Sequence, residues 1–295
     1  MTSFKGLGVA MVTPFRKDLE VDVVGLKKLT NHIVTGGADY LVVMGTTGET
    51  PSLDKEDRKL VLDTIVETNA GRKPIVIGIG GNHTREVASQ ISRLDTTGIS
   101  AILSVTPYYN KPSQNGLFEH YQALSECSKL PIILYNVPGR TGCNLLPDTI
   151  LRIAFDCRNV IGIKEASGHM EQIMSLIRDK PKNFMVISGD DAITLPLIAA
   201  GADGVISVVG NALPTEFSAM VHHAMAGELE QARKLHYRML EFTQLLFKEG
   251  NPAGIKEALA HLDICEHYLR LPLTTVSSET SDRMRRVLVE EEFVK

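Results

Sequence analysis

The sequence predicts an α/β fold, namely a (β/α)8 barrel with a small C-terminal α-helical extension. Eight short apolar runs rich in Val and Ile recur along the chain, and polar segments with helical periodicity separate them. Continuous rather than alternating hydrophobicity is typical of parallel strands that are covered on both faces. The chain has 295 residues, which is enough for eight strand–helix units, because such a barrel needs about 250 residues.

The eight runs predict the strands in chain order. They lie at residues 6–12, 39–45, 74–81, 100–107, 131–138, 160–167, 184–191 and 204–211. Helix signals occur between them. Ser52-Leu53-Asp54 leads into a helix-period segment that has polar residues in its first turn and ends before Gly71, and Thr84 begins another segment that Gly98 follows. Eight strands alternating with helices are the pattern of a TIM barrel.

The last part of the chain predicts an appended helical unit. The eighth run ends near Asn211, and from about Pro214 the sequence reads as continuous helix. We therefore expect the barrel over residues 1–225 and the extension over residues 226–295. A doubly wound sheet, the main alternative, usually has a Gly-rich turn after its first strand, whereas this chain has Met11-Val12-Thr13-Pro14 there.

Composition excludes several classes of function. The formal net charge is -4 without a long run of one sign, which argues against binding to nucleic acid or an anionic membrane. The four cysteines lie far apart, and the nine histidines form no recognisable ligand set, so no metal site is predicted. We see neither a signal peptide nor an apolar run of bilayer length, and we expect a soluble cytoplasmic protein.

Polar residues gather where the predicted strands end. In chain order they are Gly45-Thr46-Thr47-Gly48-Glu49, Tyr108-Tyr109-Asn110-Lys111-Pro112, Tyr135, Arg140, Lys164 and Gly189-Asp190-Asp191. Active sites of such barrels form at the carboxyl ends of the strands. These residues therefore predict a shared pocket.

Lys164 is the strongest candidate for a catalytic group. Alternation places Ile161 and Ile163 on one face of the sixth strand and Val160, Gly162 and Lys164 on the other. The isoleucines suit the helix-facing side, so Lys164 should point into the barrel, with room left by Gly162. Desolvation disfavours an ammonium group there and favours the neutral amine, which can attack a keto group to form an imine.

Each candidate also has a structural interpretation. Lys164 could pair with Glu165 or Asp190, or lie in solvent at the rim. For the turn at 189–191 we favour a simple strand-to-helix cap over a catalytic role.

For three further candidates, a functional and a structural interpretation both remain open. Tyr135 could relay protons near the amine, or be a core residue whose hydroxyl binds the backbone. Thr46 and Thr47 could hold a carboxylate, or cap a helix. Arg140 could bind a carboxylate in a bidentate manner, or form a surface salt bridge.

Five motifs occur in order along the chain: Gly45-Thr46-Thr47-Gly48-Glu49, Pro107-Tyr108-Tyr109-Asn110-Lys111-Pro112, Tyr135-Asn136-Val137-Pro138-Gly139-Arg140-Thr141-Gly142, Gly162-Ile163-Lys164-Glu165 and Gly204-Val205-Ile206-Ser207-Val208. With these motifs the chain closely resembles the dihydrodipicolinate synthase family of pyruvate-dependent aldolases, over nearly its full length. The resemblance implies condensation of pyruvate with L-aspartate 4-semialdehyde, on the diaminopimelate route to lysine. It also implies a homotetramer built from tight dimers and no cofactor.

The resemblance assigns roles to individual residues. Lys164 matches the residue that forms the imine with pyruvate, and Tyr135 matches the proton donor and acceptor. Thr46 and Tyr109 match the rest of the proton relay, in which the tyrosine reaches the active site of a neighbouring subunit. Thr47 matches the residue that holds the pyruvate carboxylate.

Two further matches concern the substrates. The backbone at Ile206 matches another substrate contact, and Arg140 matches the arginine that receives the carboxylate of aspartate semialdehyde. Arg140 also favours this family over a sialic-acid-type lyase, which typically lacks an arginine there. The alternatives are a related aldolase for N-acetylneuraminate or a 2-keto-3-deoxy sugar acid, and a non-catalytic barrel that binds a keto acid.

The resemblance extends to a lysine-binding regulatory site. Asn82, Glu86 and Tyr108 match residues of that site, but Lys55 and Arg58 stand where inhibited relatives often have a histidine. A cation beside the ammonium group of bound lysine would repel it. We therefore expect weak or absent inhibition by lysine.

Overall fold

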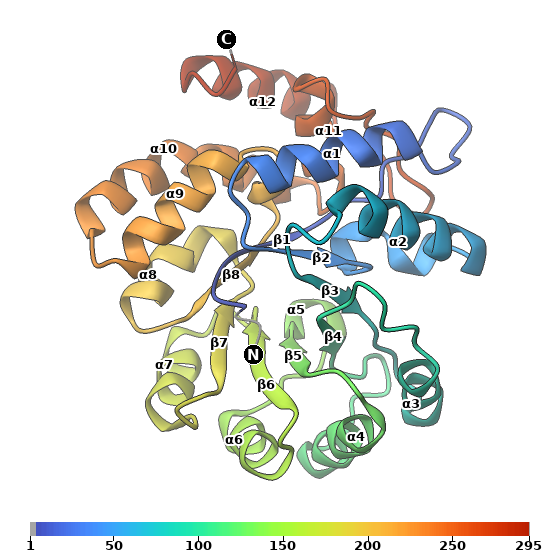
Figure 1. Ribbon diagram of the computed structural model, residues 1–295. Coiled ribbons are helices and arrows are strands. Elements are labelled where there is room, and N and C mark those ends of the chain that lie inside the picture. Colours follow the sequence, from blue (N-terminus) through green and yellow to red (C-terminus); the bar gives the residue numbers. More distant parts are fainter. Residues whose placement is uncertain (1–3, 295) are drawn as a thin grey trace.

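The computed structural model describes residues 4–294 and contains a closed barrel of eight parallel strands (Figure 1). The strands follow chain order around the barrel, and β1 pairs with β8 from Gly6 opposite Gly204 onward. The predicted barrel is confirmed. The strands are β1 (Gly6–Ala10), β2 (Tyr40–Val43), β3 (Ile75–Gly78), β4 (Ala101–Val105), β5 (Ile132–Asn136), β6 (Val160–Glu165), β7 (Met185–Ser188) and β8 (Gly204–Ser207).

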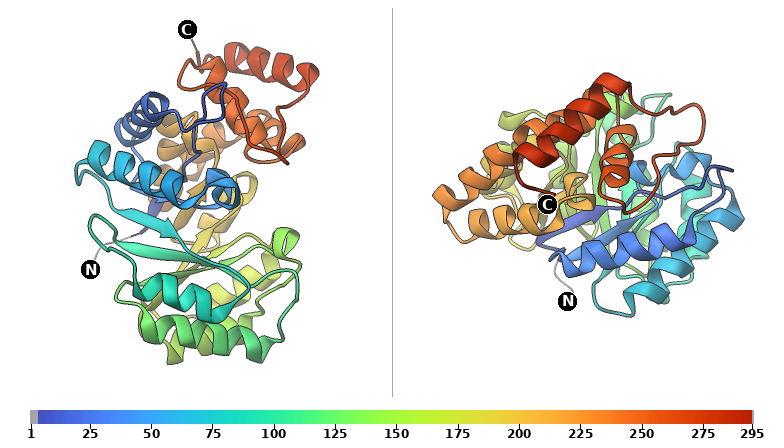
Figure 2. Two further views of the ribbon diagram at one scale, coloured as in Figure 1. Left: turned by 90° about the vertical axis from the view of Figure 1, so that its right-hand side faces the viewer. Right: turned by 90° about the horizontal axis from the view of Figure 1, so that it is seen from above.

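Helices cover the outside of the barrel between successive strands (Figures 1 and 2). They are α1 (Val23–Thr35), α2 (Lys55–Asn69), α3 (Thr84–Ser92), α4 (Gln114–Cys127), α6 (Pro147–Asp156), α7 (Met170–Asp179), α8 (Thr194–Ala199) and α9 (Pro214–Met225). The short helix α5 (Pro138–Thr141) follows β5, and 3-10 turns follow other strands, including η1 (Thr46–Gly48), η2 (Thr50–Ser52), η3 (Asp191–Ile193) and η4 (Val209–Asn211).

The predicted helix signals are largely confirmed at α2 and only partly at α3. The Asp54 side chain caps α2 by accepting from the Asp57 N–H at 2.8 Å, and the helix ends at a left-handed Ala70, just before Gly71. Helix α3 begins at Thr84 as predicted, but it ends at Ser92 instead of continuing to Gly98.

Two separate apolar layers fix which way each strand residue points. One layer lies between the strands and the helices. The other fills the barrel interior and contains buried residues from every strand except β6, which contributes the partly buried Ile161; it includes Ala10, Val42, Val76, Leu103, Ile133, Tyr135, Ile187 and Ile206. Tyr135 and Ile206 therefore face the inside of the barrel.

Strand β6 contains an irregularity that the alternating pattern does not predict. Its register with β5 shifts, so that Val160 pairs with Ile132 while Gly162 pairs with Ile133. Ile161, the extra residue, packs against the interior layer, whereas Val160 lies in the outer layer. The predicted faces of Val160 and Ile161 were therefore wrong. From Gly162 onward, the predicted alternation of β6 side chains between the two faces holds.

The predicted last barrel helix and C-terminal helical extension are confirmed, but the helix is not continuous from Pro214. After α9 the chain forms α10 (Leu229–Lys248), α11 (Ala253–His261) and α12 (Ser278–Glu290), with an irregular segment between the last two. Gly227 and Gly250 adopt positive φ values of 81° and 102° between these helices, a conformation that favours glycine. The division predicted at residue 226 falls in the turn between α9 and α10 and stays a prediction.

The C-terminal helices, orange to red in Figure 2, gather on one side of the barrel. Within α10, Met239 and Leu246 are buried, while Phe247 is exposed. Within residues 4–294, no helix combines the length and the apolar character that crossing a membrane requires.

Candidate active site

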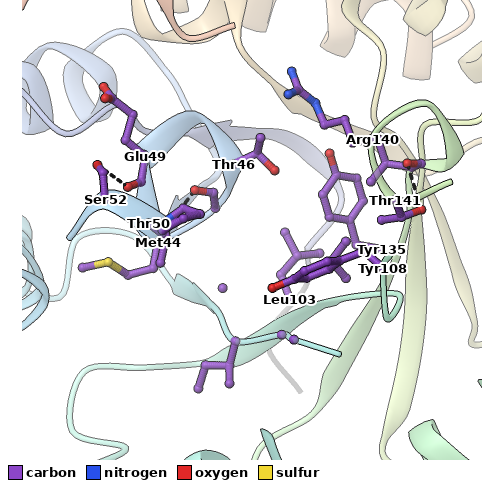
Figure 3. Close-up of a pocket in the computed structure, with 18 of the residues that line it drawn as sticks. Met44, Thr46, Glu49, Thr50, Ser52, Leu103, Tyr108, Tyr135, Arg140 and Thr141 are labelled. Carbon is purple, nitrogen blue, oxygen red and sulfur yellow. Dashed lines mark hydrogen bonds between the residues drawn. The ribbon is translucent and has the colours of Figure 1, made fainter. Parts of the chain in front are cut away.

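A cavity of about 710 Å³ opens at the carboxyl ends of the strands (Figure 3). Its walls come from the loop after β2, the end of β5 with α5, and the segment around Asn251 between α10 and α11. Thr46, Tyr135 and Arg140, all predicted site residues, border it. Lys164 does not line this cavity but lies directly against Tyr135.

Lys164 is buried beside an aromatic ring and has no carboxylate partner among residues 4–294. Its side chain is in the barrel next to Tyr135, its partner in the β5–β6 register, and its Nζ lies 4.3 Å from the centroid of that ring. The residue is 6% exposed, and among the described residues no carboxylate oxygen lies within 4.0 Å of Nζ. The amine is therefore not neutralised by an ion pair.

The acidic residues suggested as partners of Lys164 have other roles. The Asp190 carboxylate accepts from the Ala192 N–H at 3.0 Å, so it caps η3 as predicted. Glu165 is buried on the opposite face of β6, and its carboxylate accepts from Asn136 and from the Ser167 N–H. Burial raises the pKa of Glu165 against these hydrogen bonds. The network ties β5 to the end of β6, where Lys164 lies.

Gly189 provides the space for the Lys164 side chain. A Cβ atom at Gly189 would lie 3.0 Å from Lys164 Cε and 3.1 Å from Cγ. At Gly162, by contrast, a Cβ atom would meet the Met185 backbone oxygen at 2.7 Å. The prediction that Gly162 makes room for the lysine was therefore wrong, because Gly162 instead allows close packing of β6 on β7.

Thr46 and Thr47 form the turn η1 directly after β2. Thr46 lines the cavity, and its backbone oxygen accepts from the Glu49 N–H at 3.1 Å. Thr47 is 3% exposed, and its Oγ1 accepts from Asn251 Nδ2 at 3.0 Å. Neither threonine side chain caps η1 or η2. The first N–H groups of this turn have no intrahelical acceptor, so they are suited to binding an anionic group.

Tyr135 and Arg140 both lack the structural partners that the alternative interpretations require. In the described part of the chain, no hydrogen bond is made by the Tyr135 hydroxyl, and no carboxylate lies within 4.0 Å of the Arg140 guanidinium. Arg140 is exposed on α5 at the rim of the cavity. Figure 3 shows both side chains at the end of the cavity that Thr46 borders. Both groups are available to a substrate.

Tyr109 is a predicted site residue that lies in solvent instead of at the cavity, whereas the other predicted residues that do not line the cavity are buried. Its side chain is 85% exposed, and its φ of 73° is in the left-handed region that a tyrosine rarely adopts. The adjacent Tyr108 lines the cavity instead. The loop after β4 therefore projects an aromatic hydroxyl away from its own barrel.

Asp191, the first residue of η3 after β7, is a buried carboxylate that contacts the end of β8; the sequence pattern favoured a capping role for its turn. Asp191 Oδ2 accepts from the N–H groups of Val208 and Val209 at 2.9 and 3.3 Å. Burial raises the pKa of Asp191 to about 6. Ile206, two residues before this contact, is 1% exposed in the barrel interior. Residues 4–294 hold no cluster of three or more His, Cys, Asp or Glu side chains suited to a metal ion.

Comparison with known proteins identifies the family. Residues 3–291 match the Dihydrodipicolinate synthetase family. The chain is 50% identical to the 4-hydroxy-tetrahydrodipicolinate synthase of Flavobacterium psychrophilum, over 96% of this chain and 97% of that one.

Solved structures agree with this match. Dihydrodipicolinate synthase from Thermotoga maritima superposes with a TM-score of 0.96 at 39% identity, over 99% of each chain. The chloride-inhibited enzyme of Acinetobacter baumannii, solved in complex with pyruvate, gives a TM-score of 0.95 at 38% identity, over 99% of this chain and 100% of that one. With a family match across nearly all residues and relatives at half identity, this chain belongs to the dihydrodipicolinate synthetase family.

Proposed function

We propose that this chain is a Schiff-base-forming lyase that condenses pyruvate with L-aspartate 4-semialdehyde to give 4-hydroxy-tetrahydrodipicolinate. The observation that carries the proposal is the buried amine of Lys164, which lies 4.3 Å from the centroid of the Tyr135 ring and has no carboxylate partner among the described residues. Membership of the dihydrodipicolinate synthetase family supports the choice of substrates.

The chemistry begins with an imine. Lys164 Nζ attacks the keto carbon of pyruvate, and the carbinolamine loses water after protons pass from nitrogen to oxygen. Loss of a proton from the methyl carbon gives an enamine, whose carbon bonds to the aldehyde carbon while the aldehyde oxygen gains a proton. Attack of the amino group of the second substrate on the imine carbon then releases Lys164. The Tyr135 hydroxyl, with Thr46 and Tyr109, relays these protons.

Separate groups hold the two substrate carboxylates. The hydroxyl of Thr47 and the free N–H groups of its turn bind the pyruvate carboxylate. Arg140 binds the carboxylate of aspartate semialdehyde as a bidentate fork. The backbone at Ile206 provides a further substrate contact from β8. A sugar-acid aldolase would not need an arginine at the position of Arg140.

A complete site requires more than one chain. Tyr109 is exposed here and held in an unfavourable conformation, as expected of a residue that inserts into a partner. We therefore propose a homotetramer built from tight dimers, in which Tyr109 serves the neighbouring site. The proposed enzyme needs no cofactor and acts in the cytoplasm.

Reductive trapping tests this proposal. The protein is incubated with pyruvate and sodium borohydride, and its intact mass is measured, with Lys164→Ala as the control. We expect a pyruvate-sized adduct in the wild type and none in the variant. Absence of the adduct from folded wild-type protein would overturn the proposal. A substrate panel then separates the alternatives, because only aspartate semialdehyde should act as the acceptor.

A further inference from the structure

The loop that carries Thr46 and Thr47 is fastened to the C-terminal extension by a fully buried ion pair. Lys256 of α11 and Glu49 are 0% and 1% exposed, and Lys256 Nζ lies 2.5 Å from Glu49 Oε1. Lys256 Nζ also donates to the Tyr268 carbonyl at 2.8 Å and lies 4.1 Å from the centroid of the Phe15 ring. Burial lowers the pKa of Lys256, and Glu49 opposes this effect.

A buried ion pair is costly to form and usually adds little net stability. Such a pair can instead fix the positions of the segments that carry it, since two desolvated charges have few alternative positions. Glu49 has a φ of 53°, which is unfavourable for a glutamate and persists only where the surroundings hold it. Its other carboxylate oxygen, Oε2, accepts from the Arg270 N–H at 3.1 Å. The side chain of Glu49 is thus held from two sides by the extension.

Glu49 is also part of the proposed substrate-binding turn. The Glu49 N–H donates to the Thr46 carbonyl at 3.1 Å and so closes the turn that contains Thr46 and Thr47. A second link reaches the same turn, because Asn251 Nδ2 donates to Thr47 Oγ1 at 3.0 Å. Once the Thr47 oxygen accepts this bond, the proton of its own hydroxyl remains for an acceptor such as a carboxylate.

We propose that Lys256 is a positioning residue, which acts through Glu49 to hold the turn of Thr46 and Thr47 in the geometry that binds the substrate carboxylate. Asn251 orients the Thr47 hydroxyl in the same arrangement. The C-terminal extension thereby completes the substrate site of the barrel, although Lys256 itself does not contact the substrate. This inference rests on the proposed function of the same site.

The test compares Lys256→Met with a matched control. Lys180→Met removes another mostly buried lysine, which donates to the Phe184 carbonyl at 2.6 Å and pairs with Asp203 at 3.4 Å, at the opposite end of the strands. The readout is the pyruvate concentration that gives half-maximal trapping with borohydride, together with the Michaelis constant for pyruvate, kcat and thermal unfolding of each variant.

If Lys256 positions the turn, its variant needs a pyruvate concentration higher by about tenfold or more, since small misplacements of binding groups are costly. Lys180→Met should stay within about twofold of the wild type, even if both variants unfold at lower temperature. The double variant Glu49→Gln/Lys256→Met leaves no unpaired buried charge and should fall between the wild type and Lys256→Met.

Equal pyruvate requirements for Lys256→Met and Lys180→Met would overturn the inference. If Lys256→Met does not fold, the double variant takes its place, and a pyruvate requirement equal to that of Lys180→Met has the same meaning. Failure of the wild type itself to trap pyruvate would instead overturn the proposed function. The two failures are therefore distinguishable.

Discussion

Lys164 and Tyr135 are direct partners in the register of β6 and β5, and the lysine Nζ lies 4.3 Å from the centroid of the tyrosine ring. The ring therefore packs against the amine, while the hydroxyl is free of hydrogen bonds within the described residues. The ring atoms of Tyr135 thus provide packing and the hydroxyl provides proton transfer, so a substitution can remove the hydroxyl and leave the packing.

Tyr135→Phe should keep the ring beside Lys164 and remove only the hydroxyl. We expect kcat to fall by about 10²- to 10⁴-fold, the range typical of losing a general acid–base group. The thermal unfolding temperature should not change, because the hydroxyl has no hydrogen bond to lose. Steady-state kinetics and a thermal melt check this prediction. A kcat within a few-fold of the wild type would contradict a role for Tyr135 in proton relay.

Mixing two inactive variants tests whether Tyr109 serves a neighbouring site. Tyr109→Phe and Lys164→Ala should each be nearly inactive alone. In a mixed oligomer, one site would combine the intact lysine of one chain with the intact tyrosine of the other, so activity should return. Each variant taken alone through the same mixing treatment is the control. If the mixture stays inactive while mass spectrometry shows mixed oligomers, Tyr109 does not act between chains.

Arg140→Ala should affect one substrate more than the other. Loss of a charge-assisted hydrogen bond costs about 1.5–3 kcal/mol, so the Michaelis constant for aspartate semialdehyde should rise roughly 10- to 100-fold. The pyruvate requirement for borohydride trapping should be unchanged. Stability should also be unchanged, because Arg140 is exposed and forms no ion pair among residues 4–294. Equal effects on both substrates would argue against this assignment.

Asp191 should make stability depend on pH. Burial raises the pKa of its carboxyl from 3.8 to about 6, so between these values the folded state binds more protons than the unfolded state. Stability from this group is therefore lost as pH rises, by on the order of 3 kcal/mol between pH 4 and 7. Denaturant unfolding of the wild type and Asp191→Asn checks this. The difference in unfolding free energy, wild type minus variant, should fall across that range; a constant difference would contradict the prediction.

L-lysine should inhibit this enzyme weakly, at concentrations above the micromolar range. Arg58 lines the cavity near Asn82 and Glu86, and it is held there by hydrogen bonds to the carbonyls of Leu53 and Thr50. Arg58→Ala should strengthen inhibition by removing a cation that repels the ammonium group of lysine. Lys55→Ala is the control, because Lys55 is not among the described residues that line the cavity. Micromolar inhibition of the wild type would contradict the prediction.

The barrel could be predicted from the sequence because strands covered on both faces are recognisable as apolar runs. The same pattern placed Lys164 in the interior. It failed at Val160 and Ile161, because a shift in pairing with the neighbouring strand leaves no mark in one strand's own sequence. It also failed beyond Pro214, where helical spacing continues through turns that glycines at 227 and 250 create.

The supporting contacts of the site were not predictable in this way. Glu49 and Lys256 are separated by 207 residues, and only the folded chain brings them together. One signal was present in the sequence: Lys256 interrupts an otherwise small and apolar helix start, Ala253-Gly254-Ile255. A lysine at such a position requires a buried partner. Sequence spacing alone could not identify which carboxylate provides it.

The contacts of Thr47 with Asn251 and of Glu49 with Lys256 also have a consequence for biosynthesis. The ribosome makes every strand of the barrel before it reaches Asn251, so the residues of the sheet are synthesised before those that hold the turn of Thr46 and Thr47. The groups that would bind pyruvate come into place only when nearly the whole polypeptide has been translated. Premature termination after β8 would thus remove the partners of both Thr47 and Glu49, and we expect such a chain to be unable to bind pyruvate.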